Sequence, residues 1–239
     1  MVLPLLGGPE DPSRSELYPG LTSVDGTVTG TISFRASYNP EANRFVILRQ
    51  GDSEPDNAVT LSGLFEIRIE ERTDKSLFRL PALFVPQVEP IPARHFGADN
   101  TACLCSPFEE DDFLTPEFQW NPFLDQLVIP FLYGQVYYTA QAHWPWAEYA
   151  HYETGILEAY AKLQDHSKAE QCLRMLSRYP SWPALRSGLA HKPFFPGHTL
   201  CFCGQQKAIR RCHRQALDGA LRLQKDVRAL GLTLPGIGR

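Results

Sequence analysis

The 239-residue sequence predicts an α+β protein: an antiparallel strand meander packed against helices, followed by a helical connector and a small metal knuckle with a terminal helix. Between residues 26 and 70, apolar and polar residues alternate, as in strands with one buried face. From residue 122 onward, apolar residues recur at helical spacing. Three cysteines and one histidine then fall within residues 201–213. Because the strands precede the helices, we expect segregated layers.

The first strands are expected as a hairpin. Residues 1–25 contain several prolines and glycines, which favour irregular structure. Segments 27–34 and 44–48 then alternate in polarity, and Asn39-Pro40 between them is typical of a turn. The sequence therefore predicts two antiparallel strands joined there.

A third strand is predicted over 64–70, with Phe65, Ile67 and Ile69 on one face. Segment 74–83 is either a fourth strand or an extended run. Several prolines then interrupt regular structure, and 96–105 is expected to be a loop.

The second half of the chain is predicted to be helical. Segment 122–140 carries a long apolar pattern, and Pro130 is expected to kink or end that helix. Segments 144–163 and 168–179 are amphipathic and are also expected to be helices. A proline-rich connector follows, and a last helix is predicted within 205–231, ended by Gly231.

The composition is that of a globular protein, with 43% hydrophobic and 21% charged residues. No apolar run approaches the roughly 20 residues that a membrane helix needs, and the start lacks the basic segment of a signal peptide. We therefore expect a cytoplasmic location and no membrane partner. In a reducing compartment, cysteines serve metal binding or chemistry rather than disulfides.

The net charge of −4 hides an asymmetry. From Gln205 onward, eight Lys and Arg face two Asp, so the preceding residues carry about −10. Two interpretations are open: a solvated basic helix face, or a surface that binds an acidic partner or nucleic acid. Seven of these cations lie in the predicted terminal helix: Lys207, Arg210, Arg211, Arg214, Arg222, Lys225 and Arg228.

The densest group of ligand-type residues predicts a structural zinc site. Cys201, Cys203, Cys212 and His213 offer three thiolates and one imidazole, a set that suits tetrahedral Zn²⁺. Gly204 allows a tight turn behind the first two ligands. A closed four-ligand site leaves no position for a reacting water, so catalysis by this metal is not expected.

One loop carries a resemblance to a known family. Residues 91–104 place His95 eight residues before Cys103-Leu104, and this resembles the active-site loop of the ubiquitin-conjugating (UBC) fold. The Trp144-Pro145-Trp146 segment and the residues around 151–160 are similar to the bacterial branch. Bacterial members often end in a SEC-C-like zinc knuckle, which the cysteine and histidine cluster matches. The resemblance covers about residues 17–213.

The resemblance implies a domain organisation: a ubiquitin-conjugating-like domain over 1–165, a helical connector over 166–197 and a SEC-C-like zinc-binding tail over 198–239. It also implies an activity. Cys103 would accept a ubiquitin-like protein from the thioester of an activating enzyme and pass it to a target protein amine. The family further suggests a role in antiphage defence.

The same resemblance assigns roles within the loop. His95 would hold the loop backbone. Asp99 would ease the approach of a substrate lysine or stay a solvated carboxylate, and Asn100 would be a turn residue or bind the oxyanion. Where eukaryotic members place an asparagine two residues after the histidine, this chain has Gly97, and Tyr152 follows His151 where bacterial members usually have glycine.

Other interpretations stay open. The chain could be a catalytically silent UBC-fold adaptor that docks partners through its zinc knuckle, or a cysteine hydrolase that uses His95, His143 or His151 as base. Cys103 alone could be a small buried hydrophobe, and Cys105 either a core residue or a resolving thiol. Cys172 is expected in the core. An aromatic cluster is expected as a core seam or a lid over the Cys103 loop: Trp144, Trp146, Tyr149 and Tyr152.

Overall fold

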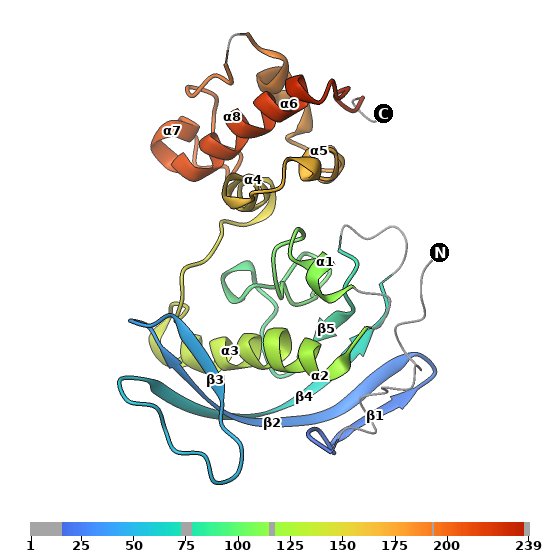
Figure 1. Cartoon of the computed structure of the whole chain (residues 1–239), viewed down its shortest axis with the longest axis vertical. Coiled ribbons are helices and arrows are strands. Elements are labelled where there is room, and N and C mark those ends of the chain that lie inside the picture. Colours follow the sequence, from blue (N-terminus) through green and yellow to red (C-terminus); the bar gives the residue numbers. More distant parts are fainter. Residues whose placement is uncertain (1–15, 73–77, 115–117, 193, 237–239) are drawn as a thin grey trace. The chain divides into compact units, whose positions relative to one another are not determined.

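The computed structural model describes residues 16–72, 78–114, 118–192 and 194–236 (Figure 1). The chain divides into two compact units, Met1–Glu148 and Tyr149–Arg239. The first unit is α+β, as the sequence predicts, and the described part of the second is helical. Each unit is described by itself below.

The first unit is built on one antiparallel sheet of five strands. The long strand β2 pairs with β4 over twelve residue pairs, and β5 lies beyond β4. The other edge of β2 pairs with β1 at one end and with β3 at the other. The strands are β1 (Leu21–Val24), β2 (Thr27–Asn39), β3 (Arg44–Ile47), β4 (Val59–Glu70) and β5 (Ala82–Phe84).

A nearly continuous helical segment covers one face of this sheet (Figure 1). It comprises α2 (Trp120–Phe123), a π-helical turn (Leu124–Val128) and α3 (Ile129–Gln141). The expected end at Pro130 is wrong. Proline lacks an N–H and its ring crowds the carbonyl four residues earlier, and the wider π turn just before Pro130 accommodates both defects. Two short helices complete the unit: the 3₁₀ turn η2 (Pro92–Arg94) and α1 (Glu110–Phe113).

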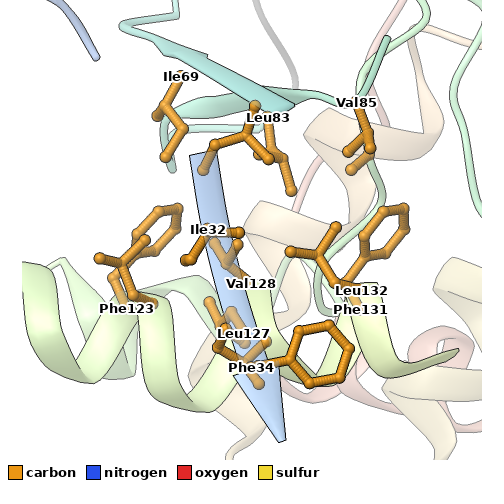
Figure 2. Close-up of a cluster of buried hydrophobic side chains, with 14 of the residues drawn as sticks. Ile32, Phe34, Ile69, Leu83, Val85, Phe123, Leu127, Val128, Phe131 and Leu132 are labelled. Carbon is orange, nitrogen blue, oxygen red and sulfur yellow. The ribbon is translucent and has the colours of Figure 1, made fainter. Parts of the chain in front are cut away.

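The core of the first unit lies between the sheet and this helical segment (Figure 2). Inward residues of β2 and β4 alternate with polar residues on the opposite face, which is the pattern of a sheet covered on one side. Ile67 and Ile69 are buried, as the alternation predicts. Figure 2 labels ten of the buried side chains: Ile32, Phe34, Ile69, Leu83, Val85, Phe123, Leu127, Val128, Phe131 and Leu132.

The second unit is organised around its last helix, α8 (Arg214–Ala229), which contacts α4, α5, α6 and α7. Helices α8 and α4 are in close contact at Gly219. An added Cβ there would overlap the Leu157 carbonyl. The other elements are α4 (Tyr152–Lys162), the 3₁₀ turn η4 (His166–Lys168), α5 (Ala169–Leu176), α6 (Trp182–Ala190) and α7 (Ile209–Cys212).

The strand predictions are confirmed in outline. The expected hairpin is β2 and β3, with its turn after Asn39, and the expected third strand is the second half of β4. The simple meander is wrong, because β4 pairs with β2 rather than with β3. Strand β1 was expected to be irregular. Of the expected segment 74–83, residues 74–77 lie outside the described residues, and β5 begins only at Ala82.

The helix predictions need three corrections. Residues 144–151 are not helical, because Ala142 ends α3 in a left-handed conformation and Pro145 disfavours helix at the residue before it. The connector contains α6, whose first turn includes Pro183. The terminal helix is interrupted at His213, between α7 and α8, and it ends at Gly231 (φ 62°) as expected.

The boundary between the two units falls between residues 148 and 149, whereas the resemblance placed domain boundaries at 165 and 197. The reason is packing: α4 lies against α8. The residues expected as connector and tail therefore share one compact unit with α4.

Within the described ranges, no helix combines the length and the apolar character needed to cross a membrane.

Replacing Gly219 with alanine should destabilise the second unit. Alanine raises helix propensity by about 1 kcal/mol over glycine, but the new methyl group would overlap the backbone of α4. We expect the unfolding free energy to fall by about 1–3 kcal/mol, measured by denaturant titration. Gly236→Ala is the matched control, because its Cβ would meet nothing within 4 Å. A Gly219→Ala variant that is more stable than the wild type would contradict the close helix contact.

Candidate functional site

The segment from Ile91 to Cys103 is a tight loop held by its own backbone. The turn η2 leads to His95, whose backbone is left-handed (φ 56°) and whose N–H donates to the Pro92 carbonyl at 2.8 Å. The Cys103 N–H donates to the His95 carbonyl at 2.8 Å, and the Ala102 N–H donates to Leu83 of β5 at 2.9 Å. The two ends of the loop are therefore fixed to each other and to the sheet.

The His95 ring contacts the segment that follows α3. Its Nε2 lies 3.1 Å from Glu148 Oε2, and the ring packs edge-on against Trp144 at a centroid distance of 4.5 Å. The Trp144 indole N–H in turn donates to the Ala93 carbonyl at 3.1 Å. These contacts suit a residue that holds the loop in place.

Arg94 fixes the same turn to α3. Its guanidinium donates to the Gln135 side chain at 3.2 Å and to the Thr139 hydroxyl, while the Gln135 amide donates back to the Arg94 carbonyl at 2.8 Å. Gln135 is buried, so this pair satisfies polar groups that water does not reach.

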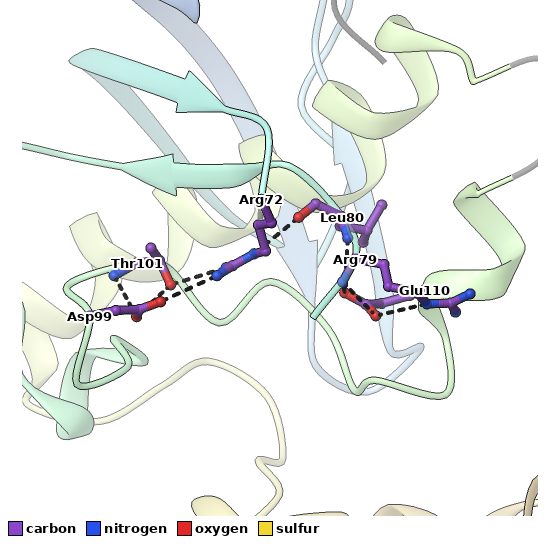
Figure 3. A network of polar contacts seen from close by, with 6 residues as sticks. All are labelled: Arg72, Arg79, Leu80, Asp99, Thr101 and Glu110. Atoms are coloured by element: carbon purple, nitrogen blue, oxygen red, sulfur yellow. Dashed lines mark hydrogen bonds and ion pairs between the residues drawn. The ribbon is translucent and has the colours of Figure 1, made fainter. Parts of the chain in front are cut away.

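Asp99 lies in a polar network centred on Arg72 (Figure 3). Its carboxylate accepts from the Thr101 hydroxyl at 2.7 Å and from the Thr101 N–H at 3.2 Å, and it pairs with Arg72 at 3.3 Å. Partial burial favours the neutral acid, but the Thr101 hydrogen bonds and the charge of Arg72 outweigh it and lower the pKa of Asp99. A carboxylate bound in this way is a weak proton acceptor.

Asn100 and Gly97 form the tip of the loop. The Asn100 N–H donates to the Gly97 carbonyl at 3.0 Å, and Asn100 is left-handed (φ 61°), a conformation that asparagine tolerates. A Cβ at position 97 would lie 2.8 Å from the Asp99 carboxylate. The space is therefore filled by Asp99, which gives a local reason for glycine at this position.

Cys103 is exposed, yet its pKa is raised to about 11. The surrounding protein atoms desolvate the thiolate, and the carboxylates of Glu110 and Glu109 also disfavour it. The charge of Arg72 acts in the opposite direction. The resting thiol is protonated at neutral pH.

The other two cysteines outside the knuckle differ in burial. Cys105 is half-buried and packs against the core of the first unit, and burial followed by the charges of Glu110 and Glu109 raises its pKa. Cys172 is fully buried on α5, so its prediction as a core residue is confirmed.

The aromatic cluster predicted around Trp144 divides between the two units. Trp144 and Trp146 pack against each other in the first unit, where Trp144 is buried and fills the space left by Gly134. This is the expected core seam. Tyr149 and Tyr152 belong to the second unit, and Tyr152 is exposed.

The second unit contains the candidate metal centre. The ligand atoms of Cys201, Cys203, Cys212 and His213 all lie within 4.8 Å of one another. Cys201 Sγ is 3.2 Å from His213 Nδ1, and Cys203 Sγ is 3.4 Å from Cys212 Sγ. Ligand atoms around one tetrahedral ion are about 3.3–3.8 Å apart, so the group is close enough to hold a metal.

Local structure explains how the four ligands meet. The Cys201 N–H donates to the Lys207 carbonyl and the Ile209 N–H donates to the Thr199 carbonyl, both at 2.8 Å, which closes a knuckle. Gly204 is left-handed (φ 80°) within it, as the expected tight turn requires. Helix α7 then supplies Cys212 at its last residue, and His213 follows directly.

The basic residues of the last segment do not form one helical stripe. Arg222 lies beside Asp226 and over the Tyr160 ring, and Arg228 donates to the His191 carbonyl. Four exposed cations are close in sequence to the candidate metal ligands: Lys207, Arg210, Arg211 and Arg214. An acidic partner at this surface stays a prediction.

Sequence reasoning missed Arg72, Thr101, Glu110 and Glu148, which surround the loop. Glu110 is buried and accepts hydrogen bonds from the Arg79 and Leu80 N–H groups (Figure 3). Burial raises its pKa despite these bonds. Thr101 lies within the loop that carries the resemblance and Glu148 follows Trp144-Pro145-Trp146, but no local pattern indicates which side chains these residues contact.

Comparison with models of known protein families, with curated proteins and with solved structures gives no match to this chain.

The reactivity of Cys103 should depend steeply on pH. With a pKa of about 11, its alkylation by iodoacetamide should be about two orders of magnitude slower at pH 7 than that of an ordinary thiol, whose pKa is near 8.5. The rate should rise about tenfold per pH unit up to about pH 10. Mass spectrometry of a Cys105→Ala variant measures this without interference from the neighbouring thiol. A rate that levels off near pH 8.5 would contradict the raised pKa.

The knuckle should bind one metal ion per chain. Cys203→Ser removes one of the three thiolates among the four ligands, so elemental analysis of the purified variant should show most of the metal lost. Cys103→Ser removes a thiol in the other unit and should leave the metal content unchanged. The site is not a metal centre if Cys203→Ser and strong chelators both leave metal content and folding as in the wild type.

Proposed function

We propose that this chain is a ubiquitin-conjugating-like transferase that carries a ubiquitin-like protein as a thioester on Cys103. The observation that supports it best is an exposed cysteine residue on a loop whose backbone is held by hydrogen bonds at Ala102 and at Cys103 itself. A cysteine kept only for packing would be buried, as Cys172 is. The sequence resemblance of the loop to the family's active-site loop gives the reaction class.

The proposed chemistry has two acyl transfers. First, the Cys103 thiol loses its proton and its sulfur attacks the thioester carbonyl of an activating enzyme. A new thioester forms on Cys103, and the activating enzyme's thiolate leaves and takes up a proton. Second, an amine of the target protein attacks the Cys103 thioester. An amide forms, the amine loses a proton, and the Cys103 thiol is restored.

Loop residues would have positioning roles in this reaction. His95, bound to Glu148 and Trp144, holds the loop backbone rather than acting as a base. Asn100 turns the loop tip. Asp99 has its carboxylate bound to Arg72 and Thr101, so we assign it to loop structure rather than to proton removal from the substrate lysine.

The proposal includes a structural zinc in a SEC-C-like knuckle. Three thiolates and one imidazole are the donor set that zinc prefers, and four protein ligands close the coordination sphere. Bound zinc would tie the chain before α7 to the start of α8. The proposed setting is the cytoplasm, where cysteines stay reduced, with a role in antiphage defence suggested by the family resemblance alone.

One observation favours a second candidate, a catalytically silent adaptor. The pKa of Cys103 is raised, and Glu109 and Glu110 disfavour its thiolate. A transferase must therefore gain its thiolate when the activating enzyme binds, whereas an adaptor needs none. In the adaptor, the same loop and the knuckle would only contact partners.

The transferase is tested by loading. With the ubiquitin-like protein and activating enzyme encoded nearest to this chain, the wild type should form a thioester that is visible on non-reducing gels and cleaved by thiols. Cys103→Ala should abolish that product, because it removes the proposed acceptor sulfur. Cys105→Ala, two residues away on the same loop, should load normally.

A thiol-sensitive product that persists in Cys103→Ala would exclude Cys103 as the acceptor. No loading of the wild type, combined with specific binding to the ubiquitin-like protein by calorimetry, would favour the adaptor.

A further inference from the structure

Arg72 is a cation whose charge acts on the Cys103 thiol, although it lies 31 positions earlier in the sequence. It follows the end of β4 by two residues, and its side chain is only 9% exposed. An arginine is rarely buried to this extent unless its donors are bound. The hydrogen bonds of its guanidinium account for this burial.

The guanidinium connects three parts of the chain. Nε donates to the Leu80 carbonyl at 3.0 Å, next to the start of β5. One terminal nitrogen lies 3.3 Å from the Asp99 carboxylate, and the other donates to the Thr101 hydroxyl at 3.0 Å. Figure 3 shows the side chain reaching from its strand to both loop residues.

Those two loop residues stand just before the thiol. Thr101 is buried, and only Ala102 separates it from Cys103. Ala102 is itself bound to Leu83 of β5 through its N–H. Arg72 thus fixes the loop just before Cys103, while the His95 carbonyl holds the N–H of Cys103 itself. The planar fork of arginine suits this arrangement, because it binds two acceptors in one geometry.

The charge of Arg72 also acts on the sulfur of Cys103. Glu109 and Glu110 both disfavour a thiolate at Cys103, whereas Arg72 favours it. Low exposure keeps water from screening this charge as it would at the surface. Its pairing with Asp99 offsets part of the field.

We propose that Arg72 is a positioning residue for Cys103: it holds the Asp99–Thr101 turn before the thiol and supplies the positive charge that favours the thiolate. This inference rests on the proposed function for its biological meaning, because a thiolate is what the first acyl transfer requires. It assigns Arg72 no contact with substrate.

The test measures the pH profile of Cys103 alkylation in a Cys105→Ala background. Arg72→Gln removes the charge and keeps a hydrogen-bonding group, so the rate at every pH below 10 should fall about threefold or more, the effect of half a pKa unit. Arg72→Lys keeps the charge but loses the planar guanidinium, so its alkylation rate should lie between those of the wild type and Arg72→Gln. Arg35→Gln is the matched control: it removes an exposed arginine of the same unit, paired with Glu54, and should leave the profile unchanged.

Asp99→Asn gives an effect of opposite sign. It removes the carboxylate that offsets Arg72, so Cys103 should become more reactive at the same pH. This variant keeps Arg72 and a side chain of the same size, so the proposal stays testable if Arg72→Gln fails to fold. Circular dichroism at each pH confirms that the fold is retained.

Profiles of Arg72→Gln and Asp99→Asn that coincide with the wild type would overturn the inference. No activating enzyme takes part in these measurements, so their outcome is independent of the loading assay. Failure of loading with shifted profiles would remove the transferase proposal alone. Normal loading with unshifted profiles would remove the role of Arg72 alone.

Discussion

The packing of one helical segment against one face of the sheet determines where the rest of the first unit can lie. Strand β2 is thirteen residues long and pairs along both of its edges, so it is the central strand of the sheet. The π turn and α3 cover that sheet with residues that are almost fully buried.

The loop that carries Cys103 is held in place by contacts with several surrounding elements. It is irregular, but its polar groups are bound to β5, to α3, to the segment after α3 and to Arg72. Loops generally lie at the surface and carry function when a rigid scaffold positions them. Here β5, α3, the segment after α3 and Arg72 all contact the loop, so an exposed Cys103 is compatible with an ordered backbone.

Residue pattern predicted what depends on neighbours in the sequence. Alternation at Phe65, Ile67 and Ile69 indicated the buried face of β4, and the spacing of Cys201, Cys203 and Cys212 indicated a compact ligand group. It could not predict contacts between distant positions. Arg72 and Glu148 reach the loop across 27 and 53 positions, and no local pattern records this. Trp144 and Trp146 were expected within a helix, but they lie in a non-helical segment. Apolar spacing alone cannot distinguish a helix from an extended segment that buries the same side chains.

The raised pKa of Cys103 has a consequence for chemical survival. Peroxides oxidise the thiolate much faster than the neutral thiol, so the resting form of this side chain is a poor target for them. An exposed cysteine with a low pKa would be converted readily to sulfenic and higher acids under oxidative stress. Cys103 is therefore an exposed residue whose protonated thiol reacts slowly with peroxides.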